Sequence, residues 1–126
     1  MIADNSVGRA TIRQLQNIGD DVVVNLDFVN APRGLMGRWT KEFNKPNMLN
    51  IFTQNNSGVR SLASTFVHEA RHAVSSARGR NQLTQSAEYM ARAREYLFNN
   101  VVRSDAAARS QIRSTVEKLY STLPWR

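Results

Sequence analysis

Hydrophobic residues return at helical spacing through the second half of the chain. From about Ser61 they recur every three or four positions, which places them on one face of a helix. This face consists of Leu62, Phe66, Ala70, Ala73, Val74 and Ala77. Gly79 follows in the position of a C-cap, because glycine readily adopts the left-handed conformation that ends many helices. The pattern predicts a helix that ends just before Gly79.

Two more helical stretches follow. A helix capped by Thr84 or Ser86 is predicted to run to about Phe98. Ser104 or Asp105 can open a last helix. The predicted inner face of that helix, before Pro124 stops it, consists of Ile112, Val116, Leu119, Tyr120 and Leu123.

The N-terminal part begins with a short helix and a strand. Asn5 or Ser6 can cap a helix that runs to about Ile18, with Gly19 ending it. Residues 21–29 are rich in β-branched side chains and predict a strand. The alternate positions expected on one side of it are Val22, Val24, Leu26 and Phe28.

A loop and a second strand are expected next. Residues 30–39 contain Pro32, Gly34 and Gly37 and predict a loop, and residues 48–54 predict a strand. The expected fold class is α+β, with a small N-terminal helix and β-strands followed by three helices. The length of 126 residues, with 41% hydrophobic and 21% charged, favours a single globular domain over residues 1–126.

The formal net charge of +7 comes mostly from scattered arginines. A basic surface favours anionic partners such as nucleic acid, a membrane surface or an acidic protein. The chain has no cysteine, which excludes disulfides and thiolate metal sites. No apolar run reaches the length of a membrane span, and the first ten residues lack the pattern of a signal peptide. If the protein leaves its cell, another device is expected to carry it.

Both histidines lie in the stretch TFVHEARHAVSS, residues 65–76. His68 and His72 are one helical turn apart and point the same way, so they can bind one metal ion. Glu69 occupies the general-base position of an HExxH metalloprotease. The apolar stripe lies almost opposite, so both histidines are predicted to face outward from the core, as are Ser64 and Ser75.

The third ligand of a catalytic zinc site must here be a carboxylate, because no further histidine or cysteine exists. Downstream candidates are Glu88, Glu95, Asp105 and Glu117. We favour Glu88, since it lies far enough after His72 for the next helix to fold back, and since the small Ala91 would let the two helices approach closely. Glu95 is the alternative ligand, or a partner that orients a histidine through its outer nitrogen. It could also be a surface charge paired with Arg92 or Arg94.

The ligand set predicts metal-assisted hydrolysis of a peptide bond. A zinc ion would activate water and polarise the scissile carbonyl, and Glu69 would carry the proton to the leaving amine. Candidate donors to the oxyanion, which the sequence does not rank, are Tyr89, Tyr96, Arg71 and Tyr120. An exposed strand edge could hold an extended peptide substrate by β-augmentation.

The HEARH motif with a later glutamate helix resembles the zincin metallopeptidases of the gluzincin type. A longer pattern over roughly residues 64–124 resembles the C-terminal toxin domains of Rhs-type polymorphic toxins. The matching residues beyond the motif are Gln85, Glu88, Tyr89, Ala91, Glu95, Leu97, Phe98, Leu119, Tyr120, Leu123 and Pro124. Arg92 departs from the pattern, which has an aromatic residue there.

The resemblance implies a minimal zincin-like domain released from a larger Rhs-type carrier. It also implies delivery, often by a type VI secretion system, a protein substrate inside a target cell and a cognate immunity protein. The charge motivates an alternative, a nucleic-acid-binding or nuclease toxin domain, although no DNA-binding motif occurs. A third possibility is a non-catalytic module in which the metal only holds the helices together.

Overall fold

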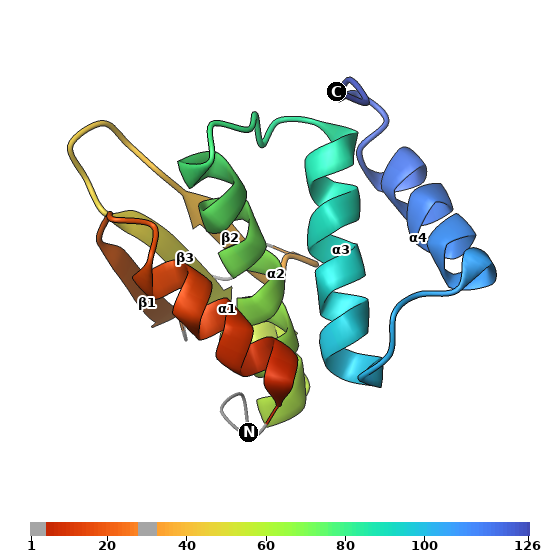
Figure 1. Cartoon of the computed structure of the whole chain (residues 1–126), viewed down its shortest axis with the longest axis horizontal. Helices are drawn as coiled ribbons and strands as arrows, with labels where there is room; N and C mark the ends of the chain where they lie inside the picture. The colour runs from red at the N-terminus through yellow and green to blue at the C-terminus, as the bar shows by residue number, and fades with distance from the viewer. Residues whose placement is uncertain (1–4, 28–32) are drawn as a thin grey trace.

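The computed structural model describes residues 5–27 and 33–126 (Figure 1). Its elements, in chain order, are α1 (Ser6–Gln16), β1 (Val22–Asp27), β2 (Gly37–Thr40), β3 (Asn47–Phe52), the 3-10 helix η2 (Thr53–Asn55), α2 (Val59–Ala77), α3 (Gln85–Asn100) and α4 (Ala106–Leu119). The predicted α+β class is confirmed for this part of the chain, which contains four α-helices and a three-stranded sheet.

The sheet has the order β1-β3-β2, with β3 parallel to β1 and antiparallel to β2. The strand expected at residues 48–54 is therefore the central strand, and its last expected residues form η2 instead. The prediction of a loop at residues 30–39 is wrong from Gly37 onward, where β2 begins. This short strand has no alternating pattern of its own and forms by pairing with β3. The expected positions of Phe28 and Pro32 lie outside the described residues.

Helix α2 occupies the middle of the molecule. It packs against β2 and β3 on one side and against α3 on another, while α1 crosses it and α4 covers α3 (Figure 1). One cluster of buried residues joins α1, the sheet and α2, and contains Leu15, Leu49, Ala70, Ala73 and Val74. A second joins α1, α2 and α3, and contains Val7, Ala63, Val67 and Phe98. The helix therefore presents side chains to three neighbours at once.

The prediction that the histidine face of α2 points outward is wrong. His72 is 5% exposed, and Ser64 and Ser75 are equally buried. Helix α3 packs over this polar face, so it is an interface between helices and not a solvated surface. The helix also begins two residues earlier than expected, at Val59.

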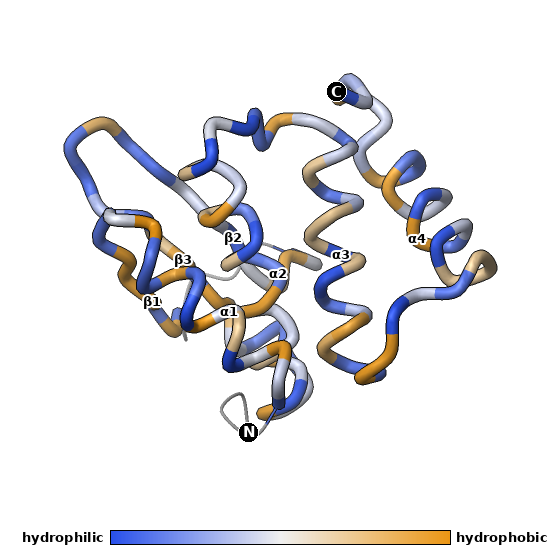
Figure 2. The backbone as a smooth tube through the Cα atoms, viewed as in Figure 1, coloured by the Kyte–Doolittle hydropathy of each residue, from blue (hydrophilic) through white to orange (hydrophobic). Residues whose placement is uncertain are grey.

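The strand predicted within residues 21–29 forms at Val22–Asp27, but most of its apolar side chains are not buried. Val24 and Leu26 are 47% and 46% exposed, and Val23 is exposed as well. The buried cluster under α1 and α2 reaches β1 only at its start, where Val22 packs against it. Apolar residues, orange in Figure 2, nevertheless run along both β1 and β3. Helix α2 packs against β3, and β3 is therefore the strand whose side chains enter the core.

The predicted helix caps agree with the structure. The side chains of Asn5, Thr84 and Asp105 each accept a hydrogen bond from a backbone N–H in the first turn of α1, α3 and α4 respectively. On α4, Val116 is fully buried, but Leu119 is 60% exposed because the helix ends there. The prediction that Leu119 lies on the inner face of α4 is therefore wrong.

The C-terminal tail returns to the start of α3. The backbone N–H groups of Gln85 and Ser86 donate to the carbonyl oxygens of Pro124 and Trp125, at 2.8 Å each. These donors belong to a first helical turn, which has no partners within the helix. The tail thus supports the end of α3 that carries Glu88. In the described parts of the chain, each helix is too short or too polar to span a membrane.

Candidate metal centre

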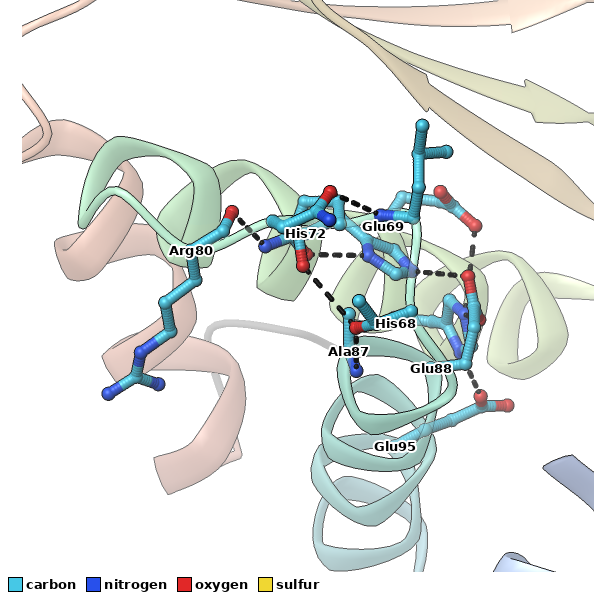
Figure 3. A network of polar contacts seen from close by, with 11 residues as sticks. His68, Glu69, His72, Arg80, Ala87, Glu88 and Glu95 are labelled. Atoms are coloured by element: carbon cyan, nitrogen blue, oxygen red, sulfur yellow. Dashed lines mark hydrogen bonds and ion pairs between the residues drawn. The ribbon is translucent and has the colours of Figure 1, made fainter. Parts of the chain in front are cut away.

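Helices α2 and α3 bring three metal-ligating side chains together. His68 and His72 from α2 and Glu88 from α3, here called the metal cluster, offer ligand atoms that all lie within 4.8 Å of one another. The Glu88 carboxylate lies against both imidazoles, with 3.3 Å from Oε2 to His68 Nε2 and 3.1 Å from Oε1 to His72 Nε2 (Figure 3). Two nitrogens and one carboxylate oxygen can therefore bind a single ion.

Each imidazole has an acceptor on its outer nitrogen. His68 Nδ1 lies 2.9 Å from Glu95 Oε1 (Figure 3). His72 Nδ1 lies 2.9 Å from Gln82 Oε1. In a neutral imidazole, an Nδ1 proton donated to one of these oxygens leaves the Nε2 lone pair available to a metal ion. This is the tautomer and orientation that metal-ligating histidines adopt in proteins. The Glu95 carboxylate lies on the side of the His68 ring away from Glu88.

Further hydrogen bonds hold both acceptors. Ser64 Oγ donates to Glu95 Oε2 at 2.9 Å, and Asn99 Nδ2 donates to Ser64 Oγ at 3.0 Å. Gln82 Nε2 donates to the Arg80 carbonyl oxygen at 2.8 Å. Gln82 is absent from the sequence-based candidates, because it lies between helices, where no periodicity indicates which polar side chain turns inward. The supports of the histidines are therefore built into the fold.

Glu69 is buried beside the metal cluster. Its carboxylate is 3.9 Å from His68 Nε2 and accepts a hydrogen bond from the backbone N–H of Trp39 on β2. Gly37 permits this close packing, since a Cβ there would lie 2.5 Å from Thr65 Cγ2 and 3.0 Å from Glu69 Cγ. Burial raises the pKa of Glu69, against the attraction of both histidines. Such a carboxylate is a better proton acceptor than one in water.

The charges of the cluster favour an imidazolium–carboxylate network in the absence of metal. Burial disfavours charge on His68, but hydrogen bonds to Glu88 and Glu95 and the nearby Glu69 together raise its pKa to about 9. Burial likewise opposes ionisation of Glu88, but its bonds to the two histidines hold its pKa well below the usual range. The pKa of Glu95 is lowered for the same reason, chiefly by His68.

The residues present fit a zinc ion. Two imidazole nitrogens and one carboxylate oxygen form a ligand set used by catalytic zinc sites, which keep a further position open. All three groups can reach the required protonation state, with neutral imidazoles and an ionised carboxylate. Other divalent ions that accept nitrogen ligands could bind the same set.

An open cleft borders the cluster. It has two adjoining cavities of about 240 and 320 Å³ that share His68, Glu69 and Tyr120 in their walls. Strand β2 forms one side, and the loop before α3 contributes Gln82 and Leu83. Both the metal ligands and the buried Glu69 are therefore accessible from the cleft.

The structure separates the candidate oxyanion donors. Tyr120 lines both cavities of the cleft, where its hydroxyl lies between Glu88, which accepts from it, and Arg92, which donates to it. Burial raises the pKa of Tyr120, and Glu88 adds to this effect. Arg71 and Tyr89 instead line a different cavity, and Tyr96 lines a third. Of the four, only Tyr120 lies beside the metal cluster.

The other carboxylates considered as ligands have separate roles. Asp105 caps α4, and Glu117 pairs with Arg113 on the exposed side of the same helix. Ala91 is fully buried between its neighbours, consistent with the close approach of α3 to α2 that it was expected to permit. Neither acid belongs to the cluster that the described residues form.

No family model matches the chain, and no curated protein or solved structure matches it either.

Proposed function

We propose that the protein is a zinc-dependent peptidase whose centre is the metal cluster. The observation that carries this proposal is the convergence of His68, His72 and Glu88 beside the buried Glu69 on an open cleft. When bound, zinc would supply Lewis acidity, which makes water nucleophilic at neutral pH and polarises a carbonyl group.

Glu69 has the position and environment of the general base. Its buried carboxylate, with a raised pKa, would accept a proton from the attacking water and pass it to the leaving amine. The hydrogen bond from the Trp39 N–H orients the carboxylate. Because the carboxylate is buried, water stabilises its charged form less, so it is a stronger base than an exposed carboxylate.

Tyr120 is the proposed donor to the oxyanion. Its hydroxyl lines the cleft beside Glu88 and could turn to the oxygen on which negative charge develops. Arg92 donates to the Tyr120 oxygen, and the hydroxyl hydrogen can therefore be donated to another group. The arginine that departs from the toxin-domain pattern thus supports a residue at the site.

Strand β2 is the proposed binding edge for an extended peptide. It is at the end of the sheet order, so one of its sides has no neighbouring strand within the described residues. Gly37 and Trp39 of this strand line the cleft. A peptide paired with β2 would pass the metal cluster. The central β3, with neighbours on both sides, has no free edge.

The resemblance supports a biological setting for this activity. We propose that the chain is a toxin domain of an Rhs-type carrier, delivered into a target cell, with a protein substrate and a cognate immunity protein. The alternative of a nuclease or nucleic-acid-binding toxin has the basic charge in its favour, +7 over the chain.

The experiment compares the wild type with Glu69→Gln in metal content, peptide cleavage and toxicity on expression in the bacterial cytoplasm. We expect about one zinc per chain in both proteins, and a loss of cleavage and toxicity of about 10²- to 10⁴-fold in the variant. Glu117→Gln, which removes an exposed carboxylate on α4, is the matched control and should retain both activities.

Three results would contradict the proposal. Purified wild-type protein without metal that also fails to take up zinc would remove the cofactor. Equal toxicity of Glu69→Gln and wild type would show that the toxic activity does not use this base. Zinc binding without any hydrolysis would identify the metal as a support of the two helices.

A further inference from the structure

The cavity that Arg71 and Tyr89 line is separate from the cleft and lies between α2, α3 and α4. It has a volume of about 400 Å³, within the range of small-molecule sites. Four arginines line it, here called the arginine pocket: Arg71 from α2, Arg94 from α3, Arg103 from the following loop and Arg109 from α4. No acidic residue is part of its lining.

The guanidinium groups of this pocket lack internal counter-charges. Among the described residues, none of the four forms an ion pair with a carboxylate. Arg94 Nε is buried without a hydrogen-bond partner there. Burial lowers the pKa of Arg71, and so does repulsion from Arg78, Arg80 and Arg94. The protein thus holds like charges together at a cost in free energy that an anion would relieve.

The rest of the lining restricts the kind of anion. Tyr89, Met90, Ala93 and Leu97 form a largely apolar wall on α3. Planar guanidinium groups bind phosphate oxygens through paired hydrogen bonds. One carboxylate would neutralise only one of four positive charges, whereas a phosphate or diphosphate group carries more charge in the same space. The apolar wall and the tyrosine ring would accept an aromatic or apolar body.

We propose that the arginine pocket binds a small phosphate-bearing ligand with an aromatic or apolar body, such as a nucleotide. The arginines come from three helices and a loop and line one cavity. The proposal is independent of the metal cluster. The proposal assigns the positive charge of these four arginines to one binding site.

The test is calorimetric titration, with thermal unfolding, of the protein as purified. The probes are inorganic phosphate, adenosine diphosphate, adenosine and a short single-stranded oligonucleotide. We expect adenosine diphosphate to bind and raise the melting temperature, phosphate to do so more weakly, and adenosine to have no effect. The oligonucleotide should bind no better than phosphate.

Variants assign the binding to the pocket. Arg94→Gln and Arg103→Gln should each weaken adenosine diphosphate at least about tenfold. Arg103 lies in an exposed loop, so its variant retains the fold even if Arg94→Gln does not. Arg13→Gln, on the exposed side of α1, removes the same charge elsewhere and should leave the affinity unchanged. An effect caused by chelation of zinc would persist in all three variants.

Three results would overturn the proposal. The first is an absence of binding by both phosphate probes. The second is binding that Arg94→Gln and Arg103→Gln leave intact. The third is binding of the oligonucleotide alone, which would make the basic side of α3 and α4 a nucleic-acid surface in place of a small-ligand pocket.

Discussion

The metal cluster and the arginine pocket are built by the same two helices but differ in how their charges are satisfied. In the metal cluster, histidines and carboxylates of opposite charge meet at 2.9–3.3 Å and bond to one another. In the arginine pocket, four arginines line one cavity whose described lining contains no carboxylate. The charges of the metal cluster are balanced without a ligand, whereas the charges of the arginine pocket have no counter-charge in its lining.

This difference has thermodynamic consequences. An incoming metal must compete with the bonds between Glu88 and the histidines and must displace the proton of His68, whose pKa is about 9. An incoming anion at the arginine pocket competes with water and with the Ser104 carbonyl oxygen, to which Arg109 donates at 2.6 Å, and it also relieves repulsion. Metal binding should therefore release protons and depend on pH, whereas anion binding should depend mainly on salt. The following variants change one region at a time.

Glu88→Gln should have the largest effect, because Glu88 is both a proposed ligand and the partner of both imidazoles. Each ligand of a zinc site contributes roughly 3–4 kcal/mol, so zinc affinity should fall by about 100-fold or more, and hydrolysis with it. Without metal, the free energy of unfolding should fall by about 1 to 3 kcal/mol. Competition with a zinc chelator and chemical denaturation measure the two effects. An unchanged zinc affinity would exclude Glu88 as a ligand.

The pH dependence of stability should reverse when metal is added. His68 has a folded pKa of about 9, above its unfolded value of 6.5. It therefore stabilises the metal-free fold below about pH 6.5, and that stabilisation, at most on the order of 3 kcal/mol, is lost as pH rises through 9. With zinc, stability should rise over the same range, because zinc binds neutral imidazole. Denaturation at several pH values, with a chelator or with zinc, checks this. Parallel profiles would contradict it.

Glu95→Gln should have a smaller effect than loss of a ligand. The variant keeps an acceptor near His68 Nδ1 but removes the negative charge that orients and polarises the ring. Zinc affinity should fall by about 10- to 100-fold while the chain stays folded. Zinc titration compares it with Glu117→Gln, an exposed carboxylate that should have no effect. A loss as large as that of Glu88→Gln would make Glu95 a ligand.

The smallest expected effect comes from supplying the missing counter-charge. Ala93→Glu places a carboxylate in the wall of the arginine pocket. We expect the free energy of unfolding to rise by up to about 1 kcal/mol and adenosine diphosphate binding to fall, since the new side chain occupies the anion's place. Ala93→Gln has the same shape without the charge and should not be stabilised. Equal stability of the two variants would show that repulsion in the pocket is negligible.

Sequence-based prediction succeeds here where the cause is local. The turn that separates His68 from His72 is a property of any helix, so their common direction follows from spacing alone. Capping by Asn5, Thr84 and Asp105 also depends only on residues within the same turn. The choice of Glu88 combined these local rules with the exclusion of other ligand types. The cluster that the structure forms contains the same three residues.

The predictions that are wrong concern surfaces whose partner lies elsewhere in the chain. The histidine face of α2 looks solvated because it is polar, yet α3 covers it and the carboxylates of α3 satisfy it. The strand predicted at β1 does form, and only the exposure of Val24 and Leu26 depends on the helices, which pack against β3 and β2. A polar or apolar pattern shows what a surface could pack against, and only the arrangement of elements shows what does.

The sequence by itself determined the elements that follow from short-range rules: the helices of the second half, their caps, and a pair of histidines with a glutamate positioned for metal chemistry. The tertiary structure decided the rest. It made β2 an edge strand beside the cleft, placed Tyr120 rather than Tyr89 at the cleft, turned Gln82 toward His72 and brought scattered arginines to the wall of one cavity. These outcomes depend on contacts between segments that are distant in the chain, and such contacts leave no periodic signal in the sequence.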